Sequence, residues 1–193
     1  MYAYNFEKDK IIWAKNYKIP FRSNLKIFNS KLITSNQNNT LQIFDKYSGK
    51  ILRSIPTEET IVKNDFKNNI ALNNEMIFFI NTFGSLYALD KNTLKINWFI
   101  NLNESVSLNN SNLFNGSIIV NEKNKIVVSS NLFTYIIDTI TGSIIYKINF
   151  SLQVKPIIID NYLFSITKKD LLIAMNLEAR EIIFSSNINQ NIS

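Results

Sequence analysis

A short pattern returns five times along this chain of 193 residues, and it limits the fold more than any other feature of the sequence. Each copy has a small or branched residue, any residue, and then Asp or Asn. A turn-like segment follows, and then Ile, any residue and, in most copies, an aromatic residue. The last residue always lies eight positions after the Asp or Asn, which itself recurs after 40, 45, 48 and 38 residues. The copies span residues 3–13, 43–53, 88–98, 136–146 and 174–184.

The third copy shows what one repeat contains. Four stretches rich in strand-forming residues follow one another over residues 69–100, and short segments with turn signals such as Asn73-Asn74 and Gly84 separate them. Consecutive short strands joined by tight turns are typical of antiparallel hairpins. A four-stranded antiparallel sheet repeated every 40–50 residues or so is the pattern of a β-propeller blade. We therefore predict an all-β protein, a β-propeller of four-stranded antiparallel blades. We expect essentially no helix, because no segment keeps a period of about 3.6 residues.

The other copies divide in the same way, so the prediction is a single partial propeller over residues 1–193. The first copy holds only the last two strands of a blade and the other four are complete, which gives about four and a half blades. Several expected strands are apolar on both faces, as in a sheet sandwiched between two neighbours. The predicted blade pieces cover approximately residues 1–19, 20–57, 65–103, 112–151 and 154–190.

The Asp or Asn of each copy has a local role in the turn between the third and fourth strands. Its side chain can accept a hydrogen bond from a backbone N–H two residues further on. Four residues after it the turn requires a positive φ, which Gly49 and Gly142 can adopt without steric cost. Leu94 stands at this place in the third copy and is expected to be strained by about 1–2 kcal/mol. Asp9 and Arg180 stand there in the first and last copies.

The residue that closes each copy is predicted to lie across the gap to the next blade. An aromatic ring in that position would bury a large apolar face. Arg53 departs from the pattern, although its aliphatic stem can still cover apolar surface. The aromatic residues that close the other copies are Trp13, Trp98, Tyr146 and Phe184.

Composition excludes several kinds of chemistry. The chain has no His and no Cys, which removes the commonest proton shuttle and metal ligand, thiolate nucleophiles, disulfides and zinc clusters. The net charge is +6, but the lysines are scattered singly, so we interpret them as solvated surface and predict no nucleic-acid partner. No stretch approaches the roughly 20 apolar residues that cross a bilayer, so no transmembrane segment is expected. Residues 1–10 lack the basic start and apolar run of a secretion signal.

The third copy also resembles a known motif. Ala-x-Asp-x-x-Thr-Gly-x-x-x-Trp is the tryptophan-docking motif of quinoprotein-type propellers, whose repeats are named after pyrroloquinoline quinone (PQQ). Residues 88–98 match it at Ala88, Asp90, Thr93 and Trp98, with Leu94 in place of the Gly. The other copies match in part, and the five lie in register over residues 2–184. The chain is therefore similar to the PQQ-like (quinoprotein alcohol dehydrogenase-like) repeat family, and within it to the outer-membrane assembly lipoproteins of the BamB type.

That resemblance implies a ring of about eight blades, of which this chain would hold roughly half. We expect either a fragment of a longer protein or a chain that pairs with another one, because a half-ring exposes an apolar blade face at each end. The BamB-type family further implies a cofactor-free, non-catalytic scaffold of the bacterial periplasm. Its loops on one face would bind the machinery that folds β-barrel proteins into the outer membrane, and the full-length protein would be lipid-anchored there. No small-molecule substrate is evident.

A second hypothesis is a fragment of a PQQ- and calcium-dependent dehydrogenase. Such enzymes hold the quinone and calcium through Glu, Asn and Asp, and many stack the quinone on a disulfide of adjacent cysteines, which this chain lacks. Acid–base catalysis needs a positioned group in a pocket. The pair Glu58-Glu59 is explained by a solvated loop between blades. We therefore predict no enzymatic activity, no cofactor, and no catalytic, cofactor-binding or metal-binding residue. The other carboxylates singled out lie in the expected turns (Asp45, Asp90, Asp138) or hairpin loops (Glu75, Glu122, Asp160).

A third hypothesis is a propeller hub that binds another protein or a polysaccharide. Two loop segments rich in Asn, residues 36–39 and 101–111, could form a polar face for such a partner. Compositional bias explains the same segments without any binding role, since Asn is abundant throughout the chain.

Overall fold

The computed structural model describes residues 1–59, 67–103, 113–114, 116 and 118–191. Regular structure in these residues consists of 18 β-strands and one short 3-10 turn, η1 (Ile188–Asn191). The prediction of an all-β chain with essentially no helix is confirmed. Nowhere in the described part of the chain is there a helix of the length and apolar character that crossing a membrane requires.

The strands form one sheet of two strands and four antiparallel sheets of four strands, which we call blades. In every sheet the strand order follows the chain, so all connections within a sheet are hairpins. The two-stranded sheet contains β1 (Tyr2–Asn5) and β2 (Lys10–Ala14). The next two blades contain β3 (Lys26–Phe28), β4 (Lys31–Ser35), β5 (Leu41–Asp45), β6 (Ile51–Ile55), β7 (Asn69–Leu72), β8 (Met76–Ile80), β9 (Ser85–Asp90) and β10 (Ile96–Asn101). The last two contain β11 (Val120–Glu122), β12 (Lys125–Ser129), β13 (Thr134–Asp138), β14 (Ile144–Ile148), β15 (Ile157–Ile159), β16 (Tyr162–Ile166), β17 (Leu171–Asn176) and β18 (Glu181–Asn187).

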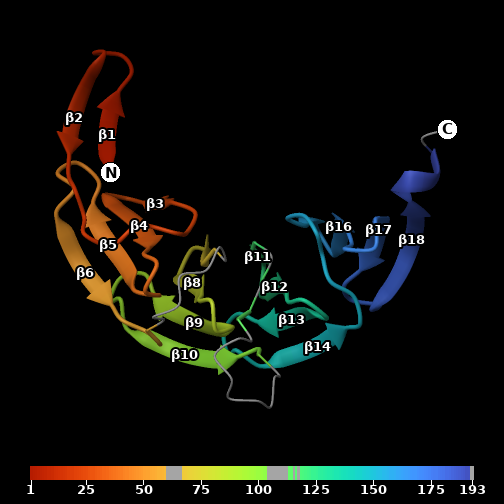
Figure 1. Cartoon of the computed structure of the whole chain (residues 1–193). Helices are drawn as coiled ribbons and strands as arrows, with labels where there is room; N and C mark the ends of the chain where they lie inside the picture. The colour runs from red at the N-terminus through yellow and green to blue at the C-terminus, as the bar shows by residue number, and fades with distance from the viewer. Residues whose placement is uncertain (60–66, 104–112, 115, 117, 192–193) are drawn as a thin grey trace.

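The blades follow one another along an open arc (Figure 1), with β6, β10, β14 and β18 on its outer side. The β1–β2 sheet stands at one end of the arc and the β15–β18 blade at the other. Because neighbouring strands are antiparallel, the first-to-second and third-to-fourth turns of each blade lie on one rim, which we call the turn rim. The second-to-third turns and the connections between blades lie on the opposite rim, the connection rim.

The repeated Asp or Asn closes its turn in all five copies. Its side-chain oxygen accepts a hydrogen bond from the backbone N–H three residues further on, at 2.6–3.0 Å. The predicted bond from the N–H two residues on is also present for Asp90, Asp138 and Asn176. The position four residues after the Asp or Asn has a positive φ in every copy, as predicted. These values are 48° for Asp9, 66° for Gly49, 58° for Leu94, 73° for Gly142 and 61° for Arg180.

A β-bulge follows each of these turns and sets the direction of the closing residue. In the β7–β10 blade Leu89 pairs with Ile96 and Ala88 with Trp98, so one residue of β10 is left without a partner. The same shift occurs at the matching place in the other four sheets. Since a bulge re-aims the side chains beyond it, the spacing "Ile, any residue, aromatic" in the sequence is the local signature of this bulge.

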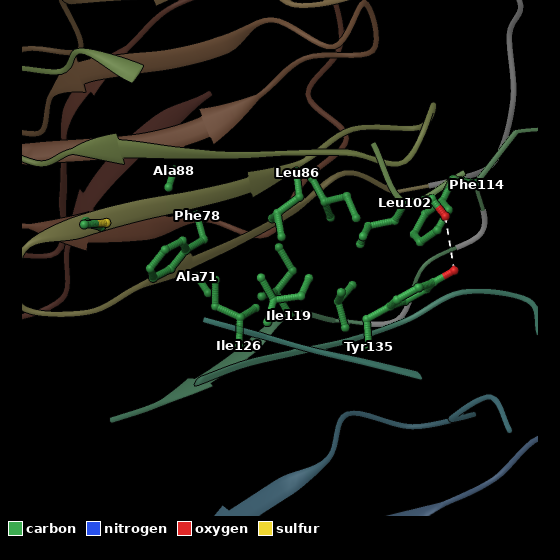
Figure 2. Close-up of a cluster of buried hydrophobic side chains, with 13 residues drawn as sticks. Ala71, Phe78, Leu86, Ala88, Leu102, Phe114, Ile119, Ile126 and Tyr135 are labelled. Carbon is green, nitrogen blue, oxygen red and sulfur yellow. Dashed lines mark hydrogen bonds between the residues drawn. The ribbon is translucent and has the colours of Figure 1, made fainter. Parts of the chain in front are cut away.

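The hydrophobic core lies between the blades. Figure 2 shows one cluster, in which Phe78 and Ala88 of the β7–β10 blade face Ile126 and Tyr135 of the β11–β14 blade. A second cluster joins β3–β6 to β7–β10, and a third joins β11–β14 to β15–β18. Each inner blade therefore has a forward face, which meets the next blade, and a backward face, which meets the preceding one. All five residues of β8 are buried, as expected for a strand between two neighbours.

Candidate functional site

Two junctions between blades are fastened by tryptophan. Trp98 of β10 reaches the next blade, where its indole N–H donates to the carbonyl oxygen of Thr139 at 3.0 Å. The ring lies against Gly142, where an added Cβ would stand 2.5 Å from the indole. Trp13 does the same one junction earlier, with its N–H 2.9 Å from the carbonyl oxygen of Lys46 and its ring against Gly49. Glycine thus provides both the positive φ and the space for the ring.

The junction between the last two blades uses tyrosine. The Tyr146 hydroxyl donates to the carbonyl oxygen of Leu177 at 2.8 Å. Arg180 occupies the glycine position, and its guanidinium lies 4.9 Å from the centre of the tyrosine ring. A cation over an aromatic face is an attractive contact, so this junction tolerates a non-glycine residue. Phe184, the closing residue of the last copy, is 49% exposed.

The junction between the β3–β6 and β7–β10 blades, which we call the Glu58 junction, has neither feature. Arg53 is exposed, and Leu94 fills the glycine position. A carboxylate fastens its connection rim instead. Glu58 follows β6, and its side chain accepts hydrogen bonds from three residues of the next blade: Asn81 Nδ2 at 2.5 Å, Ser85 Oγ at 2.7 Å and Tyr87 Oη at 3.0 Å. We predicted that Glu58-Glu59 lies in a solvated loop. Both residues are exposed, as expected for a solvated loop, and the Glu58 carboxylate is in addition tied to the neighbouring blade.

These contacts set the charge states of Glu58 and Tyr87. Burial alone raises the pKa of Glu58, but the hydrogen bonds from Ser85, Asn81 and Tyr87 lower it by more, so the pKa lies below its ordinary value. Burial, and then the adjacent Glu58 charge, raises the pKa of Tyr87 to about 12. Glu58 is therefore ionised and Tyr87 protonated across the physiological range. In these charge states the carboxylate is a charged acceptor and the phenol a donor, so the pair can hold two blades together.

Lys91 fastens the turn rim of the same junction. Its side chain is 5% exposed. The ammonium donates to the carbonyl oxygen of Asn73 at 2.6 Å and lies 3.6 Å from the centre of the Phe28 ring in the preceding blade. Burial lowers the pKa of Lys91. The Glu58 junction thus has a negative side chain at one rim and a positive one at the other.

The turn carboxylates are occupied within their own turns. Hydrogen bonds from Ser48 hold the pKa of Asp45 below its ordinary value. Those from Thr93 do the same for Asp90, and those from Thr141 for Asp138. Glu75, Glu122 and Asp160 lie at or beside first-to-second turns, as predicted. Within the described ranges, no three His, Cys, Asp or Glu residues come together as a metal site would require.

The Asn-rich segment 36–39 does not form the polar face suggested by its sequence. Asn36 and Asn39 are buried. Asn36 closes the second-to-third turn by accepting hydrogen bonds from the N–H groups of Asn38 and Thr40, each at 3.0 Å. Asn39 donates to the carbonyl oxygen of Glu58 at 3.0 Å. Of the second segment, residues 104–111 lie outside the described part of the chain.

Comparison with known proteins identifies the fold. No protein-family model and no curated protein sequence matches the chain. Among solved structures, BamB from Moraxella catarrhalis matches with a TM-score of 0.69 and 14% identity, over 92% of this chain and 53% of that chain. Quinohemoprotein alcohol dehydrogenase from Comamonas testosteroni matches with a TM-score of 0.71 and 10% identity, over 88% of this chain and 35% of that one. The computationally designed protein Ika4 matches with a TM-score of 0.61 and 12% identity, over 84% and 94% of the two chains.

These likenesses show that the chain has a PQQ-like β-propeller fold, as predicted. They also show that it spans about half the length of the BamB chain and about a third of the dehydrogenase chain. At sequence identities of 10–14%, these likenesses support an inference about the fold and none about the function.

Proposed function

We propose that this chain is a non-catalytic propeller scaffold that binds protein partners and acts, as BamB-type proteins do, in the assembly of outer-membrane β-barrel proteins. The main observation behind the proposal is that the carboxylates of Glu58 and of the repeated Asp residues make structural hydrogen bonds. Glu58 is bound to Asn81, Ser85 and Tyr87 of the next blade, and the repeated Asp residues are bound within their own turns. Glu58 and these turn carboxylates thus serve the scaffold. The similarity to BamB over 92% of the chain supports the same reading.

The proposed protein works in the periplasm, needs no cofactor and binds the barrel-assembly machinery through the connection rim. That rim presents Leu132, which is 69% exposed in the second-to-third turn of the β11–β14 blade. Lys168 of the next blade reaches the same region, and its ammonium lies 3.1 Å from Asn131 Oδ1. An exposed apolar side chain with polar neighbours is a common centre of a protein contact.

The test is direct binding of the purified chain to the soluble periplasmic domains of the assembly machinery. We expect saturable binding that Leu132→Glu weakens at least tenfold. Ile140→Glu is the matched control, because Ile140 is 62% exposed on the turn rim of the same blade, and it should leave binding unchanged. A separate titration with PQQ and calcium gives the counter-test. Saturable quinone binding with dye-linked alcohol oxidation would overturn the proposal in favour of a dehydrogenase.

A further inference from the structure

The forward face of the last blade carries an apolar row that no other blade covers in the part of the chain that the structure describes. Ile157, Phe164, Ala174 and Phe184 pair in register across β15–β18, and they are 62%, 39%, 9% and 49% exposed. The same row in the β7–β10 blade contains Ala71, Phe78, Ala88 and Trp98. Its first three members are 4%, 0% and 0% exposed, and Trp98 is half-buried. The two rows have the same place in the repeat, and the inner row differs in having the next blade against it.

The backward face of the β1–β2 sheet is open in the complementary way. Tyr2 and Tyr4 are 69% and 36% exposed. The residues at their places in the β7–β10 blade, Tyr87 and Leu89, are 9% and 1% exposed, because the preceding blade covers them. With Phe6 and Ile11, the two tyrosines line a hollow of about 450 Å³. The edge of the Tyr4 ring meets the Phe6 ring at a centroid distance of 5.3 Å.

We propose that the occupant of each open face is a second copy of this chain, so that the 193-residue chain self-associates head to tail. The forward face of β15–β18 in one copy then packs on the backward face of β1–β2 in the other. This contact continues an interface already present, since a forward face meets a backward face at every junction inside the arc. Both halves of the interface occur in the same chain, so each copy offers what the other lacks. Exposed apolar surfaces of this kind are typical of association sites.

The internal junctions also specify how the copies would meet. Phe184 of one copy lies where Trp13, Trp98 and Tyr146 lie inside the arc, and therefore packs on the third-to-fourth turn of the other copy's β1–β2 sheet. Asp9 holds the glycine position of that turn, with a φ of 48°. A side chain is tolerated there, as Arg180 under Tyr146 shows. The two contacting patches are different, so the interface is heterologous and extends into a closed ring or an open chain of copies.

The test uses one substitution on each face. Light scattering and sedimentation velocity of the wild-type chain should show assemblies that grow with protein concentration. Phe164→Glu on the forward face and Tyr2→Glu on the backward face should each give a single-chain mass. An equimolar mixture of the two variants should form a dimer that grows no further, because one intact contact remains per pair. Ile140→Glu, the same charge change away from both faces, should behave like the wild type.

Three results would overturn this inference: a wild type that stays a single chain at every concentration, polydisperse particles that neither substitution affects, or a mixture of variants that does not pair. Thermal unfolding of each variant confirms that it is folded, and Ile157→Glu replaces Phe164→Glu if that variant is not. The self-association experiment contains no other protein. Self-association can therefore be absent while binding to the assembly machinery is present, and binding can be absent while self-association is present.

Discussion

Between the β7–β10 and β11–β14 blades, Trp98 lies over Gly142, whereas the Glu58 junction has Arg53 and Leu94 in those two places. At the first junction a flat ring fills the space that glycine leaves, and its N–H satisfies a backbone carbonyl. At the second, the closing side chain is in solvent and charged groups at the two rims make the fastening contacts. Both junctions have a hydrophobic core. The repeat therefore supports two different contacts beside that core, one made by an aromatic ring and one made by charged side chains.

The tyrosine at the same place in both junctions sharpens this comparison. Tyr135 donates its hydroxyl to the backbone carbonyl of Leu102 at 3.3 Å, whereas Tyr87 donates to the Glu58 carboxylate at 3.0 Å. A carbonyl cannot titrate, and a carboxylate can. Hydrogen bonds to charged groups are also stronger than those between neutral groups. We therefore expect the contact between Trp98 and Gly142 to depend on packing, and the contact between Glu58 and Tyr87 to depend on protonation as well.

The largest expected effect comes from removing the indole. Trp98→Ala should lower the free energy of unfolding by about 3 kcal/mol, because it removes a large packed ring and leaves a cavity. Arg53→Ala, at the same register in the Glu58 junction, should cost less than about 1 kcal/mol because its side chain is exposed. Urea unfolding followed by fluorescence and circular dichroism measures both. Trp98→Phe is the control that keeps a ring without its N–H, and it should lie between them. Equal losses for the Trp98→Ala and Arg53→Ala variants would contradict the comparison.

A smaller effect is expected at Glu58. Glu58→Ala should destabilise the fold by about 1–2 kcal/mol, because Asn81, Ser85 and Tyr87 lose a shared, charged acceptor while part of that site stays open to water. Glu58→Gln keeps the shape of the side chain and one oxygen acceptor, and should cost less. The matched control is Glu59→Ala, whose side chain is exposed and should leave the unfolding midpoint unchanged. If the two alanine variants behave alike, the carboxylate does not join the blades.

Local spacing in the sequence was sufficient to predict much of this structure. The period of the Asp or Asn predicts blades, and its offset to the next glycine position predicts a positive φ even at Leu94. Those features depend on residues a few positions apart, where turn chemistry dominates. The contact of the closing residue with the next blade could also be predicted, because an aromatic residue recurs at constant spacing in most copies.

The fastening of the Glu58 junction could not be predicted in this way. Glu58 meets Asn81, Ser85 and Tyr87, which lie 23 to 29 positions away in the chain, and no repeated pattern marks that contact. Arg53 and Leu94 gave the one available signal, since a junction without its aromatic and its glycine needs other contacts. The burial of Asn36 and Asn39 could not be predicted for a related reason. A polar side chain looks exposed in a sequence, but it can close a buried turn when its hydrogen bonds are satisfied.

The smallest expected effect is on the stability of the fold at alkaline pH, where Tyr87 and Tyr135 should differ. The pKa of Tyr87 is raised to about 12 in the folded protein, so the stability that its protonated form contributes is complete below pH 10. That contribution is lost as the pH rises from 10 towards 12, because only the unfolded chain then releases the proton easily. We expect about 1 kcal/mol over this window, since the adjacent carboxylate is partly solvated. Tyr87→Phe should remove this part of the alkaline loss, and Tyr135→Phe should retain it.

Glu58→Gln tests the cause of the same shift. Burial is the largest contribution to the raised pKa of Tyr87, and the Glu58 charge is the next. Removing the charge should therefore lower the pKa of Tyr87 without returning it to 10, and phenolate absorbance should show one tyrosine titrating at a lower pH than in the wild type.

On the acid side, stability changes with pH in the opposite direction. The pKa of Glu58 is lowered in the folded state, so its contribution is present above its unfolded pKa and is lost as the pH falls through the folded value. The glutamine variant should be less sensitive at both extremes, whereas a variant of the Trp98 junction should keep the wild-type pH profile at a lower stability. If Trp98→Phe altered the pH profile as much as Glu58→Gln, the contacts made by Trp98 and Glu58 would not differ in their dependence on protonation, and the comparison would be wrong.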